Sequence, residues 1–146
     1  MKLLMLFIFT GIAEPDVALL RELYIGAATS EDIAQQLIHA SETNNSNALV
    51  KGYKGAGKML MAKYYFNPIT KLNSFINGKN ILEAAINSDT SNAELRYLRL
   101  TIQINSPGFL NYRESIKEDK TFLLNRLDTI EDEQLKTIIK NYLKSI

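Results

Sequence analysis

The sequence predicts an all-α fold in which antiparallel helical hairpins stack on one another. Two observations lead to this prediction. After residue 15, apolar residues recur at three- and four-residue spacing along most of the chain, and helix start and stop signals separate the recurrent stretches. With 146 residues and 46% hydrophobic residues, the chain can bury one core. We therefore expect a single helical domain over residues 14–146.

The first residues have the pattern of a secretory signal peptide. Lys2 precedes an apolar run from Leu3 to Ile12, and the small residue Ala13 follows. The run is shorter than the roughly 20 residues of a spanning helix, and Pro15 follows in place of a basic flank. We expect cleavage after Ala13, a periplasmic or secreted protein, and no stable membrane span in the mature chain. A buried first helix or an uncleaved membrane anchor is the alternative.

Two helices are expected next. The first covers residues 16–27 and begins at Pro15 and Asp16, because four apolar residues share one of its faces: Val17, Leu20, Leu23 and Tyr24. The second follows Thr29, which forms a variant capping box with Asp32. These helices should form an antiparallel hairpin. The polar stretch ETNNSN then connects to the rest of the chain and carries a glycosylation sequon at Asn44.

The middle of the chain predicts three more helices. The third covers residues 48–66 and stops at Asn67 and Pro68, where the fourth begins; the fourth ends at the turn NSDTSN, residues 87–92. The stretch from Leu98 to Ile104 fits both the alternation of a strand and the period of a helix. A lone strand among helices would leave its backbone groups unpaired, so we expect a helix.

The end of the chain should contain an irregular connection and two helices. Pro107 and Gly108 break the fifth helix, and FLNYRES follows as an aromatic-bearing connection. Thr129 and Asp132 are expected to cap the last helix, whose acidic residues come first and whose lysines come last, as the helix dipole favours.

The stretch GYKGAGKM, residues 52–59, resembles a phosphate-binding loop but lacks two requirements of one. Met59 stands where a hydroxyl should hold magnesium, and no buried strand precedes Gly52. We therefore expect no nucleotide site, although a strand directly before Gly52 would reopen the question of a nucleotide-binding enzyme. Close packing against a neighbouring backbone along Gly52, Gly55 and Ala56 explains the glycines instead, with a helix kink at 55–57 as the alternative.

Composition excludes several classes of site. A net charge of +1, with basic and acidic residues interleaved, gives no overall attraction to nucleic acid. The absence of cysteine excludes disulfides and thiolate chemistry, and the single histidine, His39, cannot form a two-histidine metal or catalytic site within one chain. We expect no cofactor, no metal and no nucleic-acid partner. His39 should lie at the surface near a helix end.

One polar stripe is a candidate binding surface. Arg96, Arg99 and Gln103 share a face of the fifth helix, and arginine forks suit carboxylate or phosphate ligands. Alternatively, the stripe is solvated or pairs internally with Glu94 and Asp119.

Aromatic residues offer a second candidate surface. Tyr64, Tyr65, Phe66, Phe109 and Tyr112 could line a peptide groove, or could belong to the core. We take Tyr112 with Arg96, Arg99 and Gln103 as the candidate ligand- or partner-binding residues.

A segment from about residue 75 to 99 resembles a tetratricopeptide repeat. The resemblance rests on an aromatic, a small, a large apolar and an alanine position along one helix, then a turn and an Ala-Glu pair: Phe75, Gly78, Leu82, Ala85, DTSN, and Ala93 with Glu94. It covers about a fifth of the chain and departs from the pattern at Thr90, where proline is usual. The resemblance implies stacked helical hairpins that bind peptides or proteins on a concave face.

No local constellation of nucleophile, base and oxyanion donors is present in the sequence, so we expect no enzyme. The expected function is an exported, non-enzymatic protein–protein or peptide interaction module. The alternative is a small anionic-ligand-binding or enzyme accessory protein in which Arg96 and Arg99 hold the anion.

Overall fold

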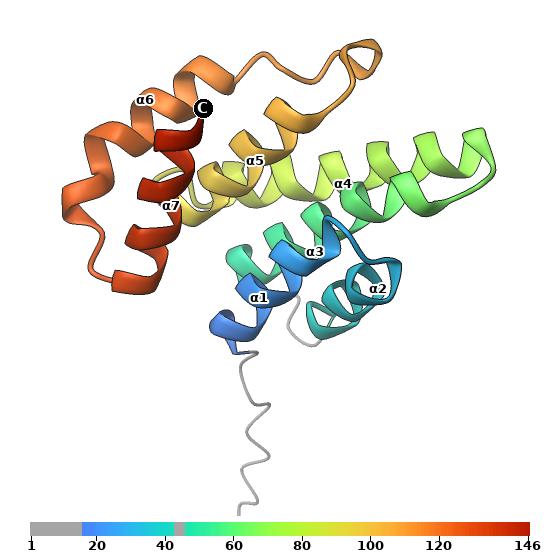
Figure 1. Cartoon of the computed structure of the whole chain (residues 1–146), viewed down its shortest axis with the longest axis horizontal. Helices are drawn as coiled ribbons and strands as arrows, with labels where there is room; N and C mark the ends of the chain where they lie inside the picture. Colours follow the sequence, from blue (N-terminus) through green and yellow to red (C-terminus); the bar gives the residue numbers. More distant parts are fainter. Residues whose placement is uncertain (1–15, 43–45) are drawn as a thin grey trace, which may run out of the picture.

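The computed structural model describes residues 16–42 and 46–146. In this part of the chain there are helices and no strand, so the predicted all-α class is confirmed (Figure 1). The α-helices are α1 (Val17–Ala27), α2 (Glu31–Ala40), α3 (Ala48–Met61), α4 (Pro68–Ser88), α5 (Ala93–Asn105), α6 (Ile116–Arg126) and α7 (Glu133–Ser145). The expected signal segment, residues 1–13, and the sequon at Asn44 lie outside the described residues.

The α1–α2 hairpin forms as expected, with one correction to its capping. Asp16 caps α1 by accepting a hydrogen bond from the Ala18 amide. At α2 the cap is Ser30 and not Thr29, because the Ser30 hydroxyl accepts from the Ile33 amide. The Thr29 hydroxyl instead donates to the Gly26 carbonyl at the end of α1. Two neighbouring hydroxyl residues in the connection thus serve different helices: Thr29 bonds back to the end of α1 and Ser30 caps α2.

The α3–α4 hairpin forms the longest arm of the molecule (Figure 1). The prediction that the third helix reaches residue 66 is wrong: α3 ends at Met61 and a 3₁₀ turn, η1 (Ala62–Tyr64), follows. Asn67 then has extended backbone angles and accepts from the amides of Ile69 and Thr70, which begins α4. An asparagine cap followed by proline at the first helical position thus determines where the connection ends and α4 begins.

Close packing at the glycines of α3 is confirmed. A Cβ atom built on Gly52 would lie 2.2 Å from Leu95 Cδ2, and one built on Gly55 would lie 2.7 Å from the backbone nitrogen of Leu82. Ala56 is fully buried beside them. α3 runs without interruption through residues 52–58, so this stretch is neither kinked out of the helix nor formed as a phosphate-binding loop.

α5 lies at the centre of the fold and is helical, as the argument from unpaired backbone groups predicted. It contacts α3, α4 and α6, and the core residues Leu95, Leu98 and Leu100 are fully buried along it. Burial on several sides explains why its apolar pattern is ambiguous between helix and strand.

The C-terminal part returns over α5 as α6 and α7 (Figure 1). The expected irregular connection is present, with a short 3₁₀ turn, η2 (Gly108–Leu110), and Asn111 in the left-handed region at φ 47°. Asp132 alone caps α7 by accepting from the Leu135 amide. Thr129 belongs to the preceding turn, η3 (Leu127–Thr129), where its hydroxyl donates to the Arg126 carbonyl, so the predicted capping pair is wrong. In the described ranges, no helix is both long and apolar enough to cross a membrane.

Candidate functional site

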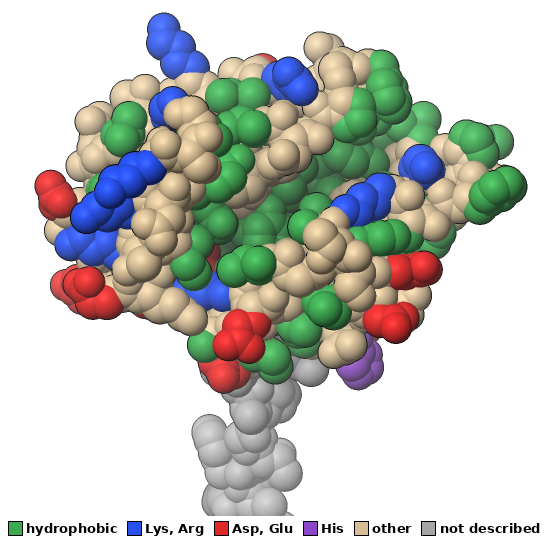
Figure 2. Space-filling view, in the orientation of Figure 1, with side chains coloured by type: hydrophobic (Ala, Val, Ile, Leu, Met, Phe, Trp, Pro, Cys, Tyr) green, Lys and Arg blue, Asp and Glu red, His purple; other side chains and the backbone are tan. Residues whose placement is uncertain are grey.

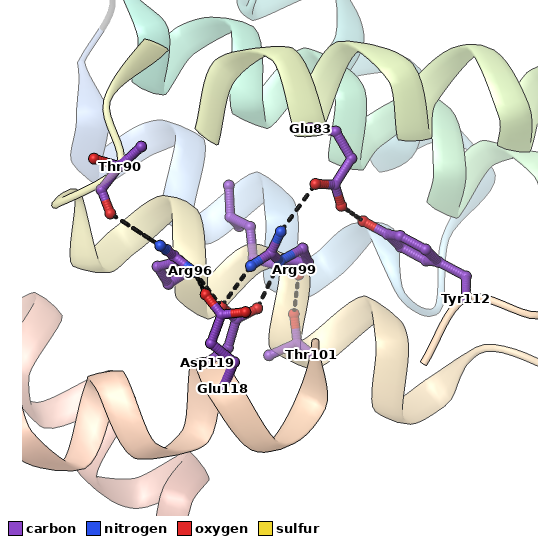
Figure 3. Close-up of polar contacts among 9 residues, drawn as sticks. Glu83, Thr90, Arg96, Arg99, Thr101, Tyr112, Glu118 and Asp119 are labelled. Atoms are coloured by element: carbon purple, nitrogen blue, oxygen red, sulfur yellow. Dashed lines mark hydrogen bonds and ion pairs between the residues drawn. The ribbon is translucent and has the colours of Figure 1, made fainter. Parts of the chain in front are cut away.

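The polar stripe of α5 turns inward, toward α4 and α6. Arg99 is only 6% exposed. Its Nε and Nη2 atoms donate to the Asp119 carboxylate at 2.6 and 2.7 Å, and its Nη1 atom donates to Glu83 at 2.9 Å (Figure 3). Asp119, on α6, is fully buried. The guanidinium therefore joins three helices, and its donors are directed at protein carboxylates.

Arg96 occupies the outer end of the same stripe. Its Nη1 atom donates to Glu118 at 2.7 Å and to Asp119 at 3.0 Å, while its Nη2 atom donates to the Thr90 carbonyl at 3.2 Å (Figure 3). Its guanidinium also stacks over the Phe122 ring, 4.9 Å from the ring centre. Asp119 is one of the two residues that the sequence suggested as internal partners of this stripe.

The electrostatics of this cluster leave no excess positive charge. Burial disfavours the Arg99 cation, but the hydrogen bonds and negative charge of Asp119, together with Glu83, outweigh burial and raise the pKa of Arg99 above its ordinary value. Two arginines meet three carboxylates: Glu83, Glu118 and Asp119. An anionic ligand would have to displace a carboxylate that already forms a charged, two-point hydrogen bond.

Tyr112 joins the cluster from the connection before α6. It is fully buried, its hydroxyl donates to Glu83, and its ring packs edge-on against Phe75 with centres 6.0 Å apart. Burial, followed by the bond to Glu83, raises the pKa of Tyr112. Lys79 Nζ lies 4.7 Å from the centre of the same ring. Glu83 is thus the residue that connects two predicted site residues, Arg99 and Tyr112.

Gln103 lies one helical turn from Arg99 and is fully buried. Neither its amide nitrogen nor its amide oxygen has a hydrogen-bond partner among the described residues. The structure therefore brings together Arg96, Arg99 and Tyr112 through shared carboxylates, and places Gln103 on the same stripe without a partner.

The other expected partner of the stripe, Glu94, belongs to a second buried network. Arg21 of α1 donates from Nε and Nη2 to the Glu94 carboxylate at 2.7 and 2.8 Å, and the Tyr53 hydroxyl donates to it at 2.5 Å. Arg21 also pairs with Asp132 at the start of α7. The hydrogen bonds that Arg21 donates to Glu94 raise the pKa of Arg21 against the effect of burial. A cavity of about 10 Å³ beside this network is no larger than one water molecule.

A groove lies between α1 and α2, on the outer side of this hairpin. Its volume is about 590 Å³, and its lining combines apolar side chains of α1 with mainly polar side chains of α2: Leu19, Leu23, Asp32, Gln35, Gln36, His39 and Ala40. Leu19 is 45% exposed. The four polar side chains are exposed, and among the described residues they make no hydrogen bond or ion pair. The groove therefore has exposed donors and acceptors without partners among the described residues, whereas the arginines of the α5 stripe are paired.

The aromatic set divides between core and surface. Tyr112 is fully buried and Tyr64 and Tyr65 are half-buried, whereas Phe66 and Phe109 are exposed. His39 is exposed near the end of α2, as expected. The sequence did not identify the groove residues as a candidate site. Amphipathic periodicity marks the apolar face of a helix, but it does not show which apolar side chains at the border of that face another element covers.

Within residues 16–42 and 46–146, no group of three or more histidine, aspartate or glutamate side chains could hold a metal ion. Comparison with family models, with curated proteins and with solved structures finds no match to this chain.

Proposed function

We propose that this chain is a non-enzymatic helical interaction module that binds a peptide or a protein segment in the α1–α2 groove. One observation carries the proposal: the groove combines exposed apolar surface with polar side chains that have no partner among the described residues. A volume of about 590 Å³ is within the range of binding clefts, roughly 300–1,000 Å³.

The chemistry of the lining suits an extended or helical peptide. Leu19 and Leu23 offer apolar contact to one or two side chains of the ligand, in the way that apolar anchors fill a groove. Gln35 and Gln36 can each donate and accept, so they can pair with backbone amides and carbonyls of the bound segment. His39 adds a polar group at the end of the groove.

The alternative of an anionic ligand held by Arg96 and Arg99 has less support. The donors of Arg99 are directed at Asp119 and Glu83, and Arg96 is held by Glu118 and Asp119. The cluster has one more carboxylate than it has guanidinium groups, so its field opposes a further anion.

We also propose that the hairpins belong to a tetratricopeptide-like stack. The four residues that carry the resemblance along α4 are all buried: Phe75, Gly78, Leu82 and Ala85. The turn that follows is held by Asn92, whose side-chain amide donates to Asp89 at 3.0 Å. These features support a repeat-like packing of α4 against its neighbours.

The site of action in this proposal is outside the cytoplasm, after removal of residues 1–13. The order of charged, apolar and small residues at the start of the sequence supports export. Intact-mass measurement of the protein recovered from the exported fraction tests this point. A mature chain beginning at Glu14 is expected, and a recovered chain that retains Met1 to Ala13 would contradict it.

The groove is tested with peptides selected on the purified chain from a random-peptide display library. Leu19→Glu places a charge in the apolar part of the groove at an exposed position, so it should weaken the selected peptides at least about tenfold without unfolding the protein. Leu124→Glu is the matched control, because Leu124 is an exposed leucine on α6. Equal affinity of the selected peptides for wild type and Leu19→Glu would remove the groove from the proposal.

A further inference from the structure

The α3–α4 hairpin has a charge distribution that the net charge of the chain conceals. Between Glu42 and Glu83 the sequence contains six lysines and no acidic residue: Lys51, Lys54, Lys58, Lys63, Lys71 and Lys79. The remainder of the chain holds the other 11 basic residues and all 16 acidic ones. This hairpin is therefore strongly cationic, while the rest of the molecule is acidic on balance.

The six lysines are also electrostatically uncompensated. No ion pair involves any of them in the part of the chain that the structure describes, where the ion pairs are all made by arginines. Lys63 donates to the Ala28 carbonyl, and Lys79 lies over the Tyr112 ring; neither contact neutralises the charge. The positive charge of this arm is therefore not neutralised by ion pairs among the described residues, and Lys51, Lys63 and Lys71 are exposed to solvent.

Exposed apolar side chains lie at the turn end of the same hairpin. Phe66 is fully exposed in the connection, and Ile69 is 70% exposed in the first turn of α4. Leu72 and Ile76 are also exposed, and the spacing of three and four residues places them with Ile69 on one face of the helix. Figure 2 shows hydrophobic and basic side chains together at the right-hand end of the molecule, where Figure 1 places this turn.

The shape of this surface determines the kind of partner that fits. Residues 66–73 are all exposed, so the end of the hairpin projects from the body of the protein. A projecting apolar end cannot enclose a peptide as a groove does, but it can insert into a lipid bilayer. An aromatic residue and aliphatic residues flanked by lysines are the composition of surfaces that lie in the headgroup region of a bilayer, about 5–10 Å deep.

We propose that the turn end of the α3–α4 hairpin docks on an anionic membrane surface, with Phe66 and Ile69 entering the headgroup region and the two lysines beside the turn, Lys63 and Lys71, facing lipid phosphates. Two independent features agree on this partner: uncovered apolar side chains and a cationic arm without acidic residues. This is peripheral binding and requires no spanning helix. It uses a surface separate from the α1–α2 groove, so either proposal can fail without the other.

A local probe tests the proposal on the full chain, independently of any contribution from residues 1–13. Because the protein has no cysteine, Ile69→Cys can carry a single polarity-sensitive fluorophore. With vesicles of phosphatidylcholine containing roughly one third phosphatidylglycerol, the emission should shift to shorter wavelength and rise several-fold. The control is Leu124→Cys with the same label, at a position on α6 that should stay in water.

Charge variants test the electrostatic part. Each lysine near an anionic surface contributes about 1 kcal/mol, so Lys71→Gln should weaken vesicle binding by about fivefold. Lys140→Gln, an exposed lysine of α7, should leave it unchanged. Equal responses of the labels at residues 69 and 124, or equal responses to anionic and to pure phosphatidylcholine vesicles, would overturn the proposal. A response at residue 69 to an acidic protein but to no vesicle would assign this end to protein binding and would also overturn it.

Discussion

Gly55 of α3 and Gly78 of α4 face each other across the centre of the long hairpin. A Cβ atom built on Gly55 would lie 2.7 Å from the Gly78 carbonyl oxygen, and one built on Gly78 would lie 2.5 Å from the Gly55 carbonyl oxygen. The obstructing atoms are backbone on both sides, so no side chain can rotate to make room. The two helices can approach this closely only because both positions lack a side chain.

This contact predicts that alanine at either glycine destabilises the protein. Gly78→Ala should lower the free energy of unfolding by about 1–3 kcal/mol, because overpacking against backbone exceeds the gain of up to about 1 kcal/mol in helix propensity. Gly108→Ala is the control, since nothing lies within 4 Å of a Cβ atom there. Urea unfolding measures both variants, and a Gly78→Ala protein as stable as wild type would show that the helices are farther apart.

Two adjacent carboxylates of α6 should differ strongly in their contribution to stability. Asp119→Ala leaves Arg99 buried without its main counter-charge and should cost about 3–5 kcal/mol. Glu118→Ala removes a carboxylate whose side chain is 66% exposed and should cost less than about 1 kcal/mol. Urea unfolding of the two variants measures the difference, and equal losses would contradict the buried role of Asp119.

Gln103 predicts a stabilising substitution. Its side-chain amide is fully buried without a hydrogen-bond partner among the described residues, and burial of an unpaired amide costs about 1–3 kcal/mol. Gln103→Met has a similar length and no such cost, so we expect it to raise the unfolding free energy by about that amount. A less stable Gln103→Met protein would show that the amide is paired in solution.

Buried tyrosines should make the protein sensitive to alkaline pH. Burial raises the pKa of Tyr97 to about 12, and burial also raises the pKa values of Tyr24, Tyr53 and Tyr112. Below pH 10, the ordinary pKa of tyrosine, both states are protonated and no stability is lost. Above pH 10 the unfolded chain releases protons that the folded chain retains, so stability falls by about 1.4 kcal/mol per pH unit for each such tyrosine.

Unfolding midpoints in urea, measured from pH 8 to pH 11, test this dependence, with absorbance at 295 nm reporting phenolate formation. Tyr97→Phe should make the loss of stability with pH above pH 10 less steep, by the contribution of one tyrosine, about 1.4 kcal/mol per pH unit. Ionisation of all seven tyrosines near pH 10 without unfolding would contradict the burial of these hydroxyls.

Much of the fold could be predicted because local signals agree with the packing. Asp16, Asn67 and Asp132 each begin a helix by accepting a backbone amide hydrogen bond, and capping residues can be recognised in a sequence. The error in the cap of α2 arose where two neighbouring residues could serve one role. Thr29 and Ser30 both carry hydroxyls, and the sequence does not show which of the two has the extended backbone of a cap.

The candidate site was harder to predict, because it depends on contacts between distant helices. The sequence suggested that the arginines of α5 could pair with Asp119, which is correct in the structure, but it gave no reason to choose Glu83 as the bridge to Tyr112. The groove depends on the angular position of Leu19, which stays uncovered while its neighbour Leu20 is fully buried.

Chemical-shift mapping can locate the peptide that we propose binds in the α1–α2 groove. A peptide selected from the random library is added to ¹⁵N-labelled protein, and the backbone amide shifts are followed. We expect the largest changes in α1 and α2, around Leu23 and Gln36, with Arg99 and its neighbours on α5 unaffected. Changes centred on α5 and α6, with none in the first hairpin, would contradict the proposal.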